Sequence, residues 1–133
     1  QMTAKIRAAC AARRDSDFVI IARTDARGVT NFADSVDRAK LYLDAGADAI
    51  FPEAMQSPDE FAEFARQVKA PLLANMTEFG KSPLLSVAEL GQLGYAMVLF
   101  PLTAFRVAMQ AAANVYQQLA KLGTQKDLVP SMM

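Results

Sequence analysis

The stretch FVIIARTD, residues 18–25, decides the fold. It begins with an apolar, mostly β-branched run, which is typical of a strand buried on both faces of a parallel sheet. The run ends at Arg23, Thr24 and Asp25. In α/β folds the ligand sites lie at the carboxyl ends of parallel strands. The stretch therefore predicts a buried strand with polar groups at the ligand-binding edge of a sheet.

The same pattern, an apolar strand that leads through polar residues into a helix, recurs three times downstream. Strands are predicted at residues 18–24, 47–51, 72–76 and 97–100. Helices are predicted at residues 2–13, 32–45, 57 to about 68, 86 to about 93 and 103–122, with a tail of little periodicity from about residue 123. Residues 25–31 are predicted to form a loop.

Alternating strands and helices predict an α/β fold with a parallel sheet and right-handed crossovers. Four βα units amount to half of an eight-stranded (β/α)8 TIM barrel, so the whole chain, 1–133, is predicted to be one partial domain. A half barrel leaves open strand edges and an uncovered inner face, which is unfavourable for a chain on its own. The alternative is an open doubly wound sheet. Its dinucleotide-binding version is disfavoured because no glycine-rich phosphate loop follows any strand.

Helix-end signals support these boundaries. Ser57 is a predicted N-cap, with Pro58 at the first helical position and Glu60 three residues after the cap. Ser86 and Glu89 form a capping-box pattern at the next helix. Glycine stops are predicted at Gly46, Gly94 and Gly123.

Composition narrows the function classes. The chain is 53% hydrophobic and has 14 basic and 14 acidic residues, a balance that suggests neither a nucleic acid nor a membrane surface as partner. It has one cysteine, Cys10, which fits a reducing, cytoplasmic location, and no histidine, so acid–base chemistry would fall to other side chains. No apolar run approaches the roughly 20 residues of a membrane span. The start at Gln1, almost directly in a helix, suggests a fragment or a processed product.

Polar side chains stand at or just beyond all four predicted strand ends, which share one rim in a parallel sheet. These residues are Arg23, Glu53, Asn75, Thr77 and Arg106. Two arginines at one rim suit carboxylate groups, because a guanidinium offers a planar fork of donors. Asn75 and Thr77 are neutral groups that orient small polar ligands. The predicted ligand is a di- or tricarboxylate rather than a nucleotide.

Each of these residues also has a purely structural interpretation. Arg23 and Glu53 can form an ion pair across the rim that holds the fold and binds nothing. Asn75 can form a turn, and Asp25 can cap a loop. Arg106 lies in the first turn of a predicted helix, where a surface arginine is ordinary. The residue pattern alone leaves both interpretations open.

Five motifs resemble the 2-methylisocitrate lyase family of the isocitrate lyase/phosphoenolpyruvate mutase superfamily. They are IIARTDA (20–26), AGADAIFPEA (45–54), LLANMTEFG (72–80), PLTAFR (101–106) and GTQK (123–126). The resemblance covers nearly the whole chain and implies a (β/α)8 barrel, of which this chain supplies about strands five to eight. It also implies a Mg2+-dependent cleavage of 2-methylisocitrate into pyruvate and succinate, in the methylcitrate cycle of propionate catabolism.

The resemblance implies roles for individual residues. Arg23 and Glu53 are expected to be catalytic, with Arg23 on a substrate carboxylate and Glu53 near the metal, in contact with it only through water. Asn75, Met76 and Thr77, from the NMT motif, and Arg106 are expected to bind the substrate. The family's complete enzymes are expected to be homo-oligomers, commonly tetramers.

The chain also departs from the family pattern. The family's metal-binding aspartates lie on an earlier strand, and its catalytic cysteine lies in a Lys-Lys-Cys-Gly-His loop; neither is present here. The chain alone is therefore predicted to have no lyase activity. The alternatives are a lyase for isocitrate or another 2-oxo or 2-hydroxy acid, and a non-catalytic half barrel that assembles with a partner.

Overall fold

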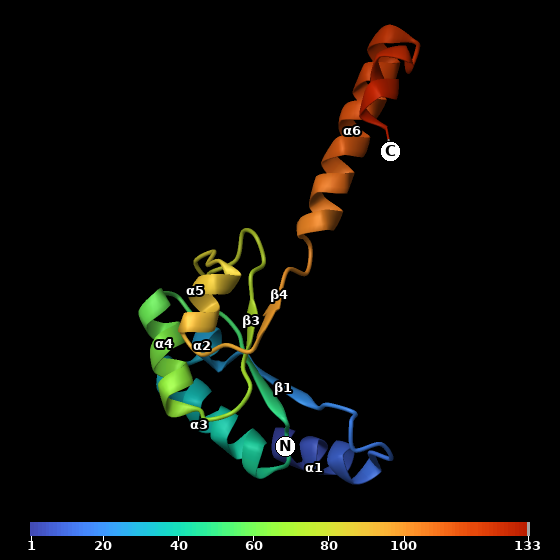
Figure 1. Cartoon of the computed structure of the whole chain (residues 1–133). Helices are drawn as coiled ribbons and strands as arrows, with labels where there is room; N and C mark the ends of the chain where they lie inside the picture. Colours follow the sequence, from blue (N-terminus) through green and yellow to red (C-terminus); the bar gives the residue numbers. More distant parts are fainter. Residues whose placement is uncertain (133) are drawn as a thin grey trace. The chain divides into compact units, whose positions relative to one another are not determined.

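The computed structural model describes residues 1–132 (Figure 1). The chain divides into two compact units, Gln1–Phe100 and Pro101–Met133. The elements of the first unit are α1 (Met2–Ala12), β1 (Ile21–Thr24), α2 (Ala26–Val29), α3 (Phe32–Asp44), β2 (Ala49–Pro52), α4 (Pro58–Gln67), β3 (Leu73–Asn75), α5 (Val87–Gln92) and β4 (Met97–Leu99). The second unit contains α6 (Thr103–Leu122) and a 3₁₀ helix, η1 (Lys126–Ser131).

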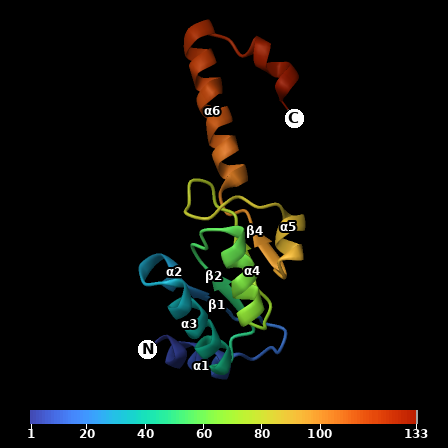
Figure 2. The ribbon, with the colours of Figure 1, turned by 90° about the vertical axis from the view of Figure 1, so that its left-hand side faces the viewer.

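The four strands are parallel and follow one another in chain order. β1 pairs with β2, and β3 pairs with β4. One parallel bridge, between Ile50 and Leu72, connects the two pairs. Helices α3 and α4 lie on the same side of the strands in both views of the first unit (Figures 1 and 2). A doubly wound sheet would carry helices on both faces, so this arrangement favours the barrel.

The face of the sheet beneath the helices forms the core. The strand residues Ala22, Ile50 and Ala74 are buried here, as is Leu72, which forms the bridge just before β3. Helix α4 covers them with Phe61 and Phe64, which are three residues apart and so lie on one side of the helix. The rings of Phe32 and Phe64, and of Phe61 and Tyr95, pack edge to face.

The opposite face of the sheet is open in the first unit. Side chains alternate between the faces of a strand, so the neighbours of the core residues point to this open face. Ile21 and Leu99 are exposed here, and Phe51 and Leu73 are half-buried. Arg23 lies on the same face, because it pairs with Phe51 in the register of β1 and β2.

The prediction of a strand at residues 18–24, buried on both faces, was wrong in two respects. β1 begins only at Ile21, which lies opposite Ala49, the first residue of β2. Ile20 still bonds to Asp48 through its main chain, but Phe18 and Val19 have no strand beside them. Phe18 and Val19 are 65% and 56% exposed. An apolar run predicts that its residues are buried, but not which element buries them. In the first unit, no described element covers Phe18 and Val19.

The local helix signals are mostly confirmed. The side chains of Ser57 and Ser86 accept hydrogen bonds at their helix N-termini, and Ser86 and Glu89 complete the capping box. Gly46 and Gly123 have φ of 106° and 66°, which suits glycine at a helix end. Two short elements were missed, since α2 lies in the predicted loop 25–31 and η1 lies in the predicted tail. Both are too short to show periodicity.

In the second unit, α6 spans the predicted residues and ends at Gly123 in the left-handed conformation. None of its residues is fully buried. Across residues 1–132, no helix is both long enough and apolar enough to cross a membrane.

The core offers a test of its packing at Tyr95. Its hydroxyl is buried and meets no hydrogen-bond partner among the described residues, and burial raises the pKa of Tyr95 far above its ordinary value. Replacing Tyr95→Phe removes an unsatisfied polar atom and keeps the ring against Phe61. We expect the free energy of unfolding in urea to rise by about 1 kcal/mol. Tyr116→Phe, at an exposed position, should leave it unchanged. A loss of stability in Tyr95→Phe would show that the hydroxyl has a partner.

Candidate functional site

Three of the predicted site residues converge at the carboxyl ends of β1, β2 and β3. Arg23 is the third residue of β1, Glu53 directly follows β2, and Asn75 ends β3. The N–H of Glu53 donates to the Thr24 carbonyl at 3.0 Å, which continues the pairing of β1 and β2 beyond Pro52. Glu53 therefore follows Phe51 onto the open face of the sheet, where Arg23 also lies.

The carboxylate of Glu53 joins the other two residues. Its Oε2 accepts a hydrogen bond from Nδ2 of Asn75 at 3.3 Å and lies 3.5 Å from Nη2 of Arg23. The guanidinium of Arg23 also lies over the ring of Phe51, with Cζ 4.9 Å from the ring centroid. Arg23 and Glu53 thus form the ion pair of the structural interpretation. The same contact also brings polar side chains together at the rim.

Asp25 is the nearer partner of Arg23. Nε and Nη2 of Arg23 donate to the Asp25 carboxylate over distances of 2.7 to 3.2 Å. These hydrogen bonds hold the pKa of Asp25 below its ordinary value and raise the pKa of Arg23. Sequence reasoning placed Asp25 at the polar end of the first strand and gave it a loop-capping role, but did not predict its pairing with Arg23. The i, i+2 spacing of Arg23 and Asp25 was the available signal, since it places both side chains on the same side of an extended segment.

The rim cluster is the set Arg23, Asp25, Glu53 and Asn75. It contains one cation and two carboxylates, so at neutral pH its formal charge is more negative than positive. Nη1 of Arg23 donates to none of the described residues, which leaves that donor for a ligand. The Oδ1 atom of Asn75 is buried and likewise finds no donor among residues 1–132. The cluster therefore holds one free donor for a small polar ligand, Nη1 of Arg23, whereas the Oδ1 atom of Asn75 is closed off by burial.

The other predicted site residues have different surroundings. The side chain of Met76 is buried in the core, where Sδ accepts the N–H of Leu85 at 3.3 Å. Any ligand contact from Met76 would use its main chain. Thr77 is half-buried and lies at the start of the loop after β3. Arg106 lies in the first turn of α6, in the second unit, so its meeting with the rim cluster stays a prediction.

A cavity of ≈ 310 Å³ opens beside the rim cluster. Its walls come from the loops after the first three strands: Asp25, Gly28, Val29, Glu53, Ala54, Gly80 and Lys81. We call it the rim pocket. Ala54 has a φ of 63°, a left-handed conformation that is unusual for a residue with a side chain. Strained backbone of this kind gathers at ligand sites.

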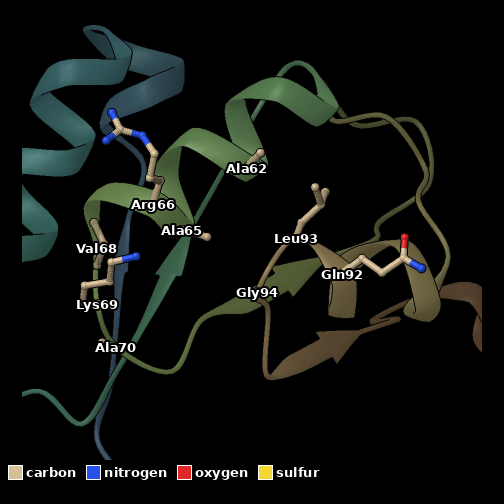
Figure 3. A pocket seen from close by; sticks show the side chains of 9 residues that line it. All are labelled: Ala62, Ala65, Arg66, Val68, Lys69, Ala70, Gln92, Leu93 and Gly94. Atoms are coloured by element: carbon tan, nitrogen blue, oxygen red, sulfur yellow. The ribbon is translucent and has the colours of Figure 1, made fainter.

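A larger hollow of ≈ 650 Å³ lies between α4 and α5 (Figure 3). Figure 3 shows Ala62 and Ala65 of α4 on one side and Leu93 and Gly94 on the other. Its lining includes Lys69 and Ala70, which come just before β3, and Gly94, which comes just before β4, so it reaches the amino ends of these strands. The rim cluster lies at the carboxyl ends, so this hollow is separate from the candidate site.

The described residues do not form a direct metal site. Nowhere in residues 1–132 do three side chains of Asp, Glu or Cys gather closely enough to bind a metal ion. In the rim cluster, the carboxylates of Asp25 and Glu53 are both occupied by Arg23. A direct bond from either carboxylate to Mg2+ would compete with these ion pairs, whereas a contact through water would leave them in place.

Comparison with known proteins places the chain in an enzyme superfamily. The model of the phosphoenolpyruvate phosphomutase family matches residues 1–120. A 2-methylisocitrate lyase of Aeropyrum pernix is 54% identical over 98% of this chain, which is 42% of that protein. The 2-methylisocitrate lyase of Escherichia coli is 46% identical over 99% of this chain and 45% of that protein. The chain thus spans less than half the length of these relatives.

Solved structures agree in fold. A 2,3-dimethylmalate lyase of the PEP mutase/isocitrate lyase superfamily superimposes with a TM-score of 0.89 at 35% identity, over 93% of this chain and 42% of that one. A phosphoenolpyruvate phosphomutase from Streptomyces platensis subsp. rosaceus gives 0.89 at 27% identity, over 98% of this chain and 46% of that one. These findings confirm both the resemblance drawn from the five motifs and the expected barrel class.

The bond between Arg23 and Asp25 predicts a pH dependence. A carboxyl group whose pKa is lower in the folded chain stabilises the fold above its unfolded pKa of about 3.9, and this contribution is lost as pH falls through the folded pKa. Replacing Arg23→Met should raise the pKa of Asp25 toward the ordinary value, as measured by carbon NMR of the carboxyl group. Arg66→Met, which removes an exposed ion pair on α4, should leave the Asp25 pKa unchanged. An unshifted Asp25 in Arg23→Met would contradict the assigned contact.

Proposed function

The chain belongs to the phosphoenolpyruvate phosphomutase family, and we propose that it works as part of a carbon–carbon lyase of the length of its relatives. The proposed reaction is the Mg2+-dependent cleavage of 2-methylisocitrate into pyruvate and succinate, a step of propionate catabolism. The observation that carries the proposal is the convergence of Arg23, Glu53 and Asn75 at one rim. Curated relatives that match almost all of this chain are 2-methylisocitrate lyases.

The proposed reaction is a retro-aldol cleavage. The 2-hydroxyl of the substrate loses its proton and becomes the keto oxygen of pyruvate, while the bond to the neighbouring carbon breaks. The electron pair passes to the carbon that becomes part of succinate, which takes up a proton. Negative charge thus moves across the substrate, and fixed positive charge and hydrogen-bond donors at the rim lower the barrier.

We assign roles from the family resemblance together with the contacts in the rim cluster. Arg23 binds a substrate carboxylate through its Nη1 edge, because Asp25 occupies its Nε edge. As the resemblance implies, Asn75, Thr77 and Arg106 bind the carboxylate on the succinate side, Asn75 through the N–H of Nδ2 that does not donate to Glu53. Glu53 holds Arg23 and Asn75 in their relative positions and reaches the metal through water.

The charge of the rim cluster supports the need for a metal. A substrate with three carboxylates would meet a cluster with more negative than positive charge, which opposes binding. Additional cations, such as Mg2+ and further arginines, would reverse this balance. Residues 1–132 do not form a direct Mg2+ site, so in this proposal the metal ligands and the acid that protonates the product come from outside these residues.

Two other functions have support from particular observations. A lyase for a related 2-hydroxy acid is favoured by the likeness to 2,3-dimethylmalate lyase at 35% identity. A non-catalytic half barrel that assembles with a partner is favoured by the open face of the sheet. For the lyase we propose a homo-oligomer, commonly a tetramer, in the cytoplasm, with no nucleic acid or membrane as partner.

The lyase proposal is tested by cleavage assays on a protein of the relatives' length that contains this chain. With Mg2+ present, we expect a higher kcat/KM for 2-methylisocitrate than for isocitrate or 2,3-dimethylmalate, and loss of activity in EDTA. Arg23→Met should lower kcat/KM by about 100- to 1,000-fold, as the loss of one charged stabiliser does elsewhere. Arg66→Met is the matched control and should keep the parent rate.

Each contrary result has a separate meaning. Equal or faster cleavage of isocitrate or 2,3-dimethylmalate would move the assignment to the related lyase. A parent-like rate in Arg23→Met would remove that residue from the site. Absence of cleavage of every acid, with the protein folded, would favour the non-catalytic half barrel. The isolated chain of 133 residues should cleave none of these acids.

A further inference from the structure

An ion pair outside the rim cluster joins helix α2, which follows β1, to the first turn of helix α4, which follows β2. Nε of Arg27, in α2, donates to both carboxylate oxygens of Glu60 at 3.0 and 2.9 Å, and Nη2 donates to Oε1 at 2.7 Å. The two side chains are only 20% and 23% exposed. The pair Arg66 and Glu63, on the same helix α4, is far more open, with Arg66 70% exposed.

Glu60 also binds the segment that follows β2. Its Oε2 accepts the main-chain N–H of Gln56 at 2.8 Å, and Nη2 of Arg27 donates to the side-chain oxygen of Gln56 at 2.9 Å. Glu60 stands where a capping box would direct its carboxylate to the N–H of Ser57. The carboxylate of Glu60 points instead toward Arg27 and Gln56. The acidic residue three positions after Ser57 therefore connects α4 to α2 and does not complete a capping box.

The segment between this ion pair and Glu53 is tightly held. Ala54 adopts its left-handed φ of 63°, which costs roughly 1–2 kcal/mol for a residue other than glycine. A Cβ atom placed on Gly28, the residue after Arg27, would lie 3.3 Å from the Cβ of Ala54. Met55 is fully buried. The segments after β1 and β2 thus come together at Gly28 and Ala54. Gly28 directly follows Arg27, and Ala54 directly follows Glu53.

We propose that Arg27 and Glu60 form a positioning clamp for Glu53. The clamp holds the strained turn at Ala54 against Gly28, and so fixes the spacing of two walls of the rim pocket. Neither clamp residue belongs to the lining of the rim pocket, so both act through Gln56, Ala54 and Gly28. The effect on activity rests on the proposed lyase function, whereas the effect on the position of Glu53 does not.

The forked geometry of Arg27 makes the clamp distinguishable from a merely structural ion pair. Arginine reaches both oxygens of Glu60 and also Gln56, whereas lysine supplies the same charge at a single point. Arg27→Lys should therefore recover most of the stability that Arg27→Met loses, without recovering the alignment of Glu53. A 1 Å misplacement of catalytic groups is enough to lower rates by about 100-fold.

The first measurement uses the protein of the relatives' length and its Arg27→Lys, Arg27→Met, Glu60→Gln and doubly substituted Arg27→Met/Glu60→Gln variants. We expect each single variant to lose about 10- to 100-fold in kcat at temperatures where it is fully folded. The double variant should lose no more than the worse single variant, because the two residues act as a unit. Arg66→Lys and Glu63→Gln are the controls and should keep the parent kcat. A parent-like kcat in Arg27→Lys would overturn the positioning role.

The second measurement is amide hydrogen exchange, which does not depend on any activity. In Arg27→Lys and Glu60→Gln we expect faster exchange at the N–H groups of Gln56 and Glu53, with little change at Ala39 in the core. If the parent protein cleaves nothing, the lyase proposal fails and exchange alone decides the clamp. Unchanged exchange at Gln56 and Glu53 would overturn the clamp whether or not the protein is a lyase.

Discussion

The alternation of side chains along parallel strands governs this structure, because only one face of the sheet in the first unit is covered by helices. On β1, Ala22 points into the core and the next residue, Arg23, points to the open face. On β3, Ala74 likewise points into the core and Asn75 points to the open face. A shift of one residue in register would place both polar side chains under the helices. Core packing and the position of the rim cluster therefore depend on the same register.

Within the rim cluster, Glu53 has the central place. It bridges Arg23 and Asn75, and its main chain continues the β1–β2 pairing through Thr24. Its neighbour Ala54 adopts a conformation that must be held by surrounding contacts. In the proposed clamp, Arg27 and Glu60 supply such contacts from outside the lining of the rim pocket. The cluster is thus well defined in geometry but short of positive charge, which agrees with a chain that spans less than half of its lyase relatives.

Sequence reasoning succeeded where a feature depends on neighbouring residues. The caps at Ser57 and Ser86 and the span of α6 follow from local rules, and the convergence of Arg23, Glu53 and Asn75 follows from the rule that parallel strands end at one rim. It failed where a feature depends on distant residues. The exposure of Phe18 depends on which elements cover it. The Arg27–Glu60 pair joins residues 33 apart in the chain, a distance at which no periodicity operates. The roles of the site residues came from the family resemblance.

In the proposed function, the rim cluster binds a small carboxylate through Arg23 and Asn75. The most direct measurement is a titration with succinate and pyruvate, in the presence of Mg2+, of the nitrogen-15-labelled protein of the relatives' length. We expect saturable shifts of the Nε–H signal of Arg23 and of the side-chain amide of Asn75, with none at Arg66. Unmoved signals from Arg23 and Asn75, or equal shifts at Arg66, would contradict binding of the acids at the rim cluster.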